Sequence, residues 1–266
     1  MQKNSQQTQS GRNNSNGLEQ NRMGTHPIFS LIVKMSLPAM FSMLIQSLYN
    51  IVDSIFVARL GESALSAVSL IYPIQLLTIA IGVGTGVGLA SLISRRLGQG
   101  RQDDADLTAS HSLFLALCSG IVFAIFGIFF SDIFAGAFSD DPLLTVPAAS
   151  YCRIICIGSI FVFASFNAER TMQATGNTVL PMICALTGAI INIVLDPILI
   201  FGLLGMPALG VTGAAIATVI GQAIATALAL FFLYTKPFPI TIHVRGFRPN
   251  IGIIKEVFIV GFPTIV

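Results

Sequence analysis

Two aspartate residues stand inside otherwise apolar stretches of the chain, and their side chains are the ones best suited to chemistry. Asp53 lies in residues 48–56 and Asp196 in residues 189–201, with no lysine or arginine within one helical turn of either. An ionised carboxylate in hydrocarbon costs at least ~2.5–3.5 kcal/mol, so such a residue is a functional candidate. The alternative is a structural role, in which each aspartate hydrogen-bonds a neighbouring helix.

Other polar side chains share a helical face with each aspartate. Asn192 precedes Asp196 by four residues, and the small residues Ala185 and Ala189 continue that face and leave room beside it. This arrangement favours a hydrated pocket, although the same polar face could instead bind helices together. The stripe that ends at Asp53 consists of Ser42, Gln46, Tyr49 and Asn50.

A pair of buried carboxyl groups can hold a proton or a cation. Burial favours the neutral form of a carboxyl group, and a second carboxyl group nearby favours it further. The oxygens of Asp53, Asp196 and Asn192 would also suit Na⁺, which prefers oxygen ligands. Pro38 and Pro197 interrupt backbone hydrogen bonding in the same two helices and could allow them to bend. The sequence therefore predicts an ion switch coupled to helix shape, with no cofactor and no permanently bound metal.

The composition places these residues in a membrane. Of the 266 residues, 54% are apolar and only 10% are charged, against about 25% charged in a typical soluble domain. A soluble protein of this size could not hide so much apolar surface. Soluble enzymes, nucleic-acid binders and disulfide scaffolds are therefore largely excluded.

Charge-free runs predict an all-α bundle of six membrane helices. A span needs about 20 apolar residues. The polar composition of residues 1–25 predicts a disordered tail. The six-helix bundle is expected to cover residues 26–235. A cytoplasmic connection and the start of a truncated second bundle are expected to cover residues 236–266. The expected helices cover residues 28–58, 64–93, 107–130, 146–168, 180–204 and 211–235, and a seventh apolar stretch begins at Ile251.

The distribution of basic residues predicts the orientation. With the N-terminal tail inside, 12 of the 14 lysine and arginine residues lie on the inner side, including those of the 94–106 loop. Asp53 and Asp196 then lie roughly 10–12 Å below the outer surface, from the rise of an α-helix. Because they share a level, we expect one outward-facing cavity to contain both.

The remaining motifs predict structural roles. The cysteines (Cys118, Cys152, Cys156, Cys184) fall within predicted spans and are expected to be buried thiols. The three histidines have no metal-ligand spacing. The glycine-rich residues 82–88 predict close helix packing. Residues 94–100 and the acidic residues that follow predict a solvated cytoplasmic turn, with gating as the alternative.

The combined motifs resemble the multidrug and toxic compound extrusion (MATE) transporters from about residue 29 to 266. The resemblance implies twelve helices in two bundles and export of cationic or amphipathic compounds by H⁺ or Na⁺ antiport. It also implies an ion-sensitive site at Tyr49, Asp53, Asn192 and Asp196, a bend at Pro38, and a site residue at Asn167. The matching pieces are Leu37-Pro38, Tyr49 to Asp53 with Leu60-Gly61, Arg95 with Leu97-Gly98, Gly176-Asn177, and Asn192 to Pro197.

The chain is about half as long as the resemblance implies. Residues 261–266 echo residues 36–41, as in a parallel internal repeat. We therefore expect a partial chain that needs the missing lobe or a second copy for transport, since alternating access requires a second bundle.

The prediction is an H⁺- or Na⁺-coupled exporter of small amphipathic or cationic compounds in the cytoplasmic membrane, with its N-terminus inside, lipid around it and no nucleic-acid partner. One alternative is a lipid-linked precursor flippase of the same superfamily, which would favour a cationic cavity. Another is an inactive fragment. Two membrane aspartates also occur in intramembrane aspartyl proteases, but Val52-Asp53 and Leu195-Asp196 lack the patterns of those enzymes.

Overall fold

The computed structural model describes residues 28–242 and 248–265 and consists of helices joined by short connections, with no strand among these residues. Six of the helices are long and apolar enough to cross a membrane, which makes this a multi-pass membrane protein. The predicted tail at 1–25 lies outside the described residues. The helices are α2 (Ile28–Ala58), α3 (Glu62–Gly98), α4 (Gln102–Gly136), α5 (Pro142–Ala174), α6 (Val179–Phe201), α7 (Val211–Thr235) and α8 (Ile251–Ile265), with a short 3₁₀ turn at Leu203–Gly205.

The predicted number and order of helices are confirmed, but α3, α4 and α5 are longer than predicted. Charge-free runs end where charged residues begin, whereas the helices continue through them. Arg95 and Arg96 occupy the last turn of α3, and Asp103 and Asp104 the first turn of α4. These charges complement the helix dipoles. The predicted 94–106 loop is therefore wrong, because only residues 99–101 separate α3 from α4.

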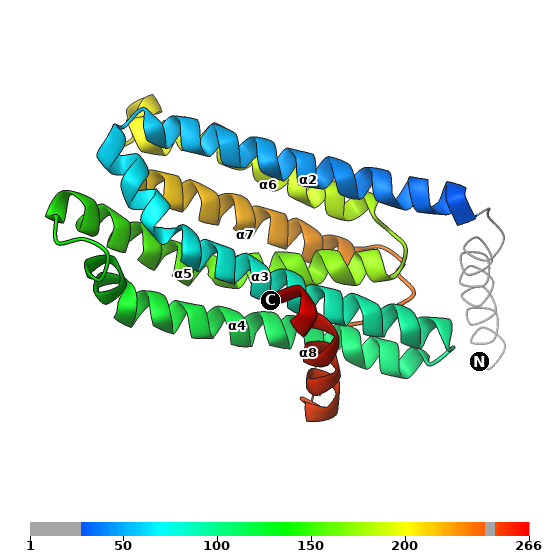
Figure 1. Cartoon of the computed structure of the whole chain (residues 1–266). Coiled ribbons are helices and arrows are strands. Elements are labelled where there is room, and N and C mark those ends of the chain that lie inside the picture. The colour runs from blue at the N-terminus through cyan, green and yellow to red at the C-terminus, as the bar shows by residue number, and fades with distance from the viewer. Residues whose placement is uncertain (1–27, 243–247, 266) are drawn as a thin grey trace, which may run out of the picture.

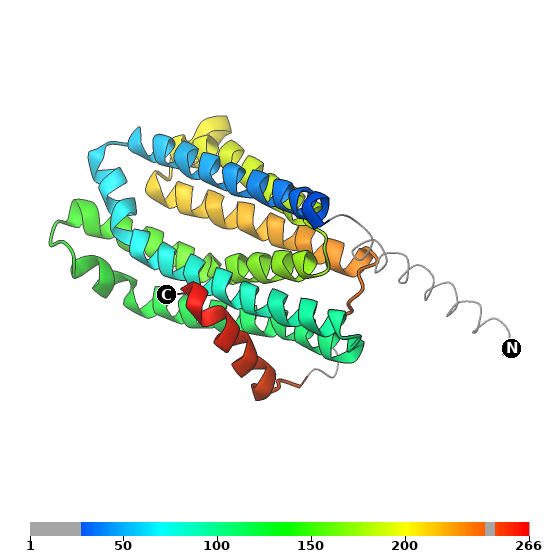
Figure 2. The ribbon, with the colours of Figure 1, turned by 45° about the vertical axis from the view of Figure 1, so that its right-hand side comes forward.

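The long helices lie side by side, and α8 crosses them at a steep angle (Figures 1 and 2). Helix α5 packs against α3, α4 and α7, whereas α2 packs mainly against α6. Only 6% of the most apolar window of α2 is buried, so this helix turns most of its surface outward. Its outer face carries large apolar side chains such as Phe41, Leu48 and Ile55, which suit contact with lipid.

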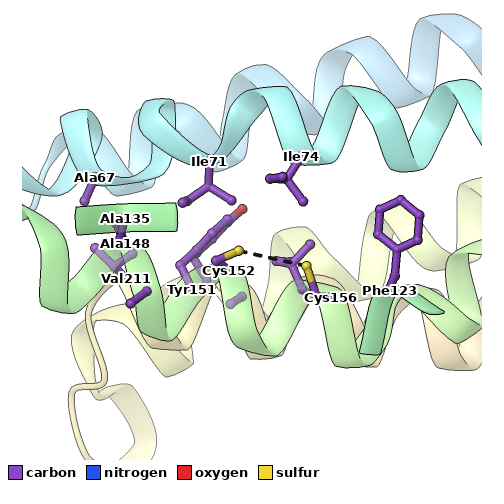
Figure 3. Close-up of a cluster of buried hydrophobic side chains, with 14 of the residues drawn as sticks. Ala67, Ile71, Ile74, Phe123, Ala135, Ala148, Tyr151, Cys152, Cys156 and Val211 are labelled. Atoms are coloured by element: carbon purple, nitrogen blue, oxygen red, sulfur yellow. Dashed lines mark hydrogen bonds between the residues drawn. The ribbon is translucent and has the colours of Figure 1, made fainter. Parts of the chain in front are cut away.

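The main core lies chiefly between α3, α4 and α5 (Figure 3), and buried residues of α2, α6 and α7 complete it. Tyr151 and Phe163 of α5 are among the largest fully buried side chains there. Cys152 and Cys156 belong to the same core, where their thiol groups share a hydrogen bond with the sulfur atoms 3.9 Å apart and form no disulfide. Cys184 is also buried, but Cys118 is exposed, so the expectation that all four thiols are buried is wrong for Cys118.

The glycines of residues 82–88 bring α3 into close contact with two other helices, as the sequence predicts. A methyl group added to Gly84 would lie 3.0 Å from the carbonyl oxygen of Gly261, and one added to Gly88 would lie 2.2 Å from that of Val257, both in α8. The next pair around the helix, Gly82 and Gly86, instead faces side chains of α5. Each face uses glycines four residues apart, which is the spacing of one helical stripe.

Candidate functional site

The carboxyl groups of Asp53 and Asp196 meet where α2 packs against α6. Each is a hydrogen-bonding neighbour of the other, and Asp196 is fully buried. The Oδ1 atom of Asp53 is buried too and receives no hydrogen bond from the described part of the chain. Two carboxyl groups can share a hydrogen bond only when one of them carries a proton. The geometry therefore suits a site that holds one proton, or a cation in its place.

Asn192 connects this pair to α7. Its amide nitrogen lies 3.3 Å from Asp196 Oδ2, and its amide oxygen accepts hydrogen bonds from the Thr218 hydroxyl at 3.3 Å and the Thr218 N–H at 3.2 Å. Thr218 was not singled out from the sequence, because a single threonine in an apolar helix carries no distinctive pattern. Through these hydrogen bonds, a change in the protonation or ion binding of the carboxyl pair can alter the packing of α7 as well as that of α2 and α6.

A cavity begins at Asn192 and lies between α2, α5, α6 and α7. It has about 540 Å³ of atom-free space, part of it open to solvent. Small residues on α6 leave this room, as the sequence predicts for Ala185 and Ala189. The polar residues of its lining are Gln46, Tyr49, Ser165, Glu169, Asn192, Thr218 and Gln222.

This cavity is not the predicted outward-facing chamber, which stays a prediction. We expected both aspartates to line an outward-facing chamber, but neither lines this cavity, which extends from Asn192 toward the beginnings of α2 and α6. Apolar side chains close the other side. Val57 and Ile200 are 1% exposed, and the rings of Phe56 and Phe201 pack edge to face with their centroids 6.2 Å apart.

Glu169 is the site residue that the sequence reasoning missed. The predicted fourth helix ends at residue 168, which leaves Glu169 outside the predicted span. Helix α5 continues to Ala174 and turns Glu169 into the cavity. The hydroxyl of Ser165 donates a hydrogen bond to Glu169 Oε1 at 3.0 Å. The serine one helical turn earlier was the signal that could have shown which face Glu169 occupies.

Tyr151 was also missed. It is buried on α5, where Gln75 of α3 donates a hydrogen bond to its hydroxyl at 2.8 Å. Tyr151 also interacts electrostatically with Asp53. The polar site therefore extends beyond α2 and α6 to α3 and α5.

Two predicted site residues lie elsewhere. Asn50 is exposed on the outer face of α2. Asn167 is buried, but it donates a hydrogen bond to the Ser112 carbonyl of α4 at 3.0 Å and accepts one from Thr85 of α3 at 3.4 Å. Asn167 therefore joins α3, α4 and α5, and it does not line the cavity.

The two prolines predicted to bend helices lie inside continuous helices. Helix α2 runs through Pro38, and α6 runs through Pro197 immediately after the buried Asp196. In α2 the hydroxyl of Ser42 donates to the Pro38 carbonyl at 3.0 Å, so this member of the polar stripe is engaged with its own helix. Bending at either proline stays a prediction.

Comparison with known proteins gives one consistent result. Residues 38–198 match the family model MatE. The chain is 32% identical over 237 residues to the multidrug export protein MepA of Staphylococcus haemolyticus, covering 89% of this chain and 52% of MepA. It is 30% identical over 241 residues to MepA of Staphylococcus aureus strain MRSA252, with the same coverage of both chains.

Solved structures agree with these relatives. A transporter of the MOP superfamily from Pyrococcus furiosus superposes with a TM-score of 0.82 at 32% identity, covering 88% of this chain and 51% of that one. An outward-facing MATE transporter of the same superfamily gives 0.83 at 32% identity and the same coverage. The chain spans about half the length of the relatives it matches. With its six-helix lobe and paired carboxyl groups on α2 and α6, the chain belongs to the MATE family of transporters, whose N-terminal lobe it represents.

Proposed function

We propose that this chain forms the N-terminal lobe of an ion-coupled exporter of small cationic or amphipathic compounds. The observation that carries the proposal is the contact between Asp53 and Asp196 at the end of a polar cavity. The carboxyl pair holds the coupling ion, H⁺ or Na⁺, and the cavity holds the compound. The lobe lies in the cytoplasmic membrane with its N-terminus inside and works together with a second lobe or a second copy of the chain.

The charge of the cavity supports a cationic cargo. Glu169 is the one charged side chain among the residues that line it. A carboxylate in a place shielded from water attracts a positive group more strongly than it would in bulk solvent. An anionic lipid-linked precursor would meet repulsion there, which disfavours the flippase alternative.

Glu169→Gln is expected to raise the dissociation constant for ethidium, a cationic dye, at least about tenfold. Loss of a well-desolvated charge contact costs more than the ~1.4 kcal/mol that corresponds to this factor. Fluorescence titration of the purified chain in lipid nanodiscs measures the constant directly, because this lobe alone supplies the described cavity lining. Nile red, an uncharged dye, serves as the matched ligand and should bind both proteins equally. An equal loss of both dyes would indicate a collapsed cavity and contradict an electrostatic role for Glu169.

The export function is tested by ethidium efflux from proteoliposomes that contain the chain. A proton gradient and a sodium gradient are imposed separately, and the gradient that drives efflux identifies the coupling ion. Efflux of an anionic lipid analogue in place of ethidium would favour the flippase. If neither gradient moves ethidium across the membrane, the chain does not export by itself, and the proposal then requires a second lobe.

A further inference from the structure

The contacts between α8 and the ends of α3 and α4 form a cluster outside the cavity. Helix α8 lies against α3 and crosses it steeply (Figure 2). Ile253 and Val257 of α8 share a small apolar core with Leu89, Leu92 and Leu115. Polar contacts surround this core, and one of them depends on the protonation state of a histidine.

His111 of α4 holds the beginning of α8. Its Nδ1 atom lies 2.7 Å from the carbonyl oxygen of Leu107, which can only accept a hydrogen bond, so Nδ1 carries a proton. Its Nε2 atom lies 2.9 Å from the backbone nitrogen of Asn250, which can only donate. Nε2 must therefore be unprotonated. Both bonds together require one neutral tautomer of a fully buried imidazole.

An ion pair between Arg96 and Glu256 provides a second contact to α8, about one and a half helical turns after Asn250. Arg96 of α3 is 8% exposed, and its guanidinium donates to Glu256 Oε2 at 2.9 Å. The same guanidinium donates to the Asp104 carbonyl at 3.2 Å and to the Thr108 hydroxyl. The His111–Asn250 and Arg96–Glu256 contacts together attach α8 to α3 and α4.

The connection before α8 is fixed to the same end of α4. The carboxylate of Asp106 accepts hydrogen bonds from the N–H of Thr241 at 2.9 Å and from its hydroxyl at 2.5 Å. Gln102 donates to Asp106 at 3.1 Å and to the carbonyl of Pro239. These bonds do not involve the histidine, and they fasten the connection to α4 separately from the His111–Asn250 contact.

We propose that His111 is a proton-operated release for α8, which docks on α3 and α4 while the imidazole is neutral and separates from them when it is protonated. Protonation puts a hydrogen on Nε2, so that two N–H groups face each other where a hydrogen bond had been. The N–H of Asn250, the residue immediately before α8, then loses its acceptor. Docking is therefore present at high pH and is lost as the pH falls.

Charged side chains of α3, α4 and α8 lie in the cluster around His111. Among the described residues, the guanidinium of Arg96 on α3 interacts electrostatically with the imidazole and would repel an imidazolium. Glu256 of α8 is bound to Arg96. On α4 itself, Asp104 pairs with Arg101 and Asp106 binds Thr241.

The test uses the absence of tryptophan from the sequence. Phe258→Trp places a single fluorophore on α8, at a side chain that is 37% exposed. The chain is reconstituted in uncharged phosphatidylcholine nanodiscs and measured between about pH 8 and pH 5, the range in which histidine ordinarily titrates. Iodide quenching of the tryptophan reports the ratio of docked to released α8, which is expected to fall at least about tenfold on acidification.

Three variants in the Phe258→Trp background decide the outcome. His111→Gln keeps a carbonyl acceptor for Asn250 and cannot be protonated in this range, so α8 should stay docked at both pH values; His111→Asn is the substitute if that protein does not fold. His111→Phe should leave α8 released at both. His243→Gln is the control for the other histidine near α8 in sequence. A pH response that survives in His111→Gln, or that disappears in His243→Gln, would overturn the proposal, as would the absence of any response in the parent protein.

Discussion

Asp53→Asn is expected to abolish efflux driven by an ion gradient while the lobe remains folded and inserted. Asparagine has nearly the shape of aspartate and can still hydrogen-bond Asp196. It can neither release a proton nor contribute a charged ligand to Na⁺, so the pair loses the two states that coupling requires. Gradient-driven efflux should fall to the background of the assay. An ion gradient can drive a conformational change only if the two conformations bind the ion with different affinities. Ethidium efflux from proteoliposomes under the driving gradient measures it.

Glu62→Gln is the matched control for Asp53→Asn. Glu62 is an exposed acid in the first turn of α3, away from the carboxyl pair, so its removal should leave efflux unchanged. Ethidium binding to Asp53→Asn should stay close to that of the unmodified chain, since Glu169 and not Asp53 lines the cavity. Undiminished gradient-driven efflux in Asp53→Asn would rule out the carboxyl pair as the coupling site.

The contact between the carboxyl groups could be anticipated because it depends on depth. Asp53 and Asp196 lie at similar distances from the ends of two helices that run in the same direction, and helical rise converts those distances into one level. The depth of the two aspartates in the membrane does not predict on which side of them the cavity lies. The direction of the cavity depends on which side chains fill each end, and the packing of Phe56 against Phe201 is a long-range contact without a local sequence signal.

The positions of Asn50 and Asn167 away from the cavity have a common geometric cause. A helix turns about 100° per residue, so Asn50 lies about 60° from Asp53, on the opposite side of it from Tyr49. Because α2 is mostly exposed, that angle is enough to carry Asn50 out of the bundle. Asn167 lies two residues from both Ser165 and Glu169, on the other face of α5. A polar residue type alone therefore does not predict that a side chain lines the cavity. The prediction fails where only a narrow strip of the helix is buried, as in α2, or where two faces of the helix are buried, as in α5.

The ends of the helices were mispredicted for a different reason. Charged residues were treated as the boundaries of spans, although Arg96 is buried and bound by Glu256, Thr108 and Asp104. The turn predicted to be solvated is thus partly a docking surface for α8. Charge patterns show where water or headgroups begin on average, whereas an ion pair with a distant segment can bury an individual arginine.

The double substitution Gly84→Ala and Gly88→Ala in α3 is expected to displace α8. The added methyl group at Gly88 would lie 2.2 Å from the backbone oxygen of Val257, and that at Gly84 would lie 2.2 Å from Ile265 Cγ1 and 3.0 Å from the oxygen of Gly261. A backbone cannot rotate away as a side chain can. Overpacking costs about 1–3 kcal/mol at each site, and both sites lie on the face of α3 that contacts α8. Iodide quenching of Phe258→Trp should therefore show α8 released even at high pH.

Gly98→Ala and Gly82→Ala provide controls on the same helix. Nothing lies within 4 Å of a methyl group at Gly98, so this change should be neutral or should stabilise α3 by up to about 1 kcal/mol. A methyl group at Gly82 would meet Phe166 Cδ2 at 2.9 Å, a ring that lines the cavity and can shift. That variant should change dye binding and leave α8 docked. Quenching in the Gly84→Ala, Gly88→Ala protein equal to that of its parent would show that α8 is not held by the glycine face, and the close approach of the two helices would then need another cause.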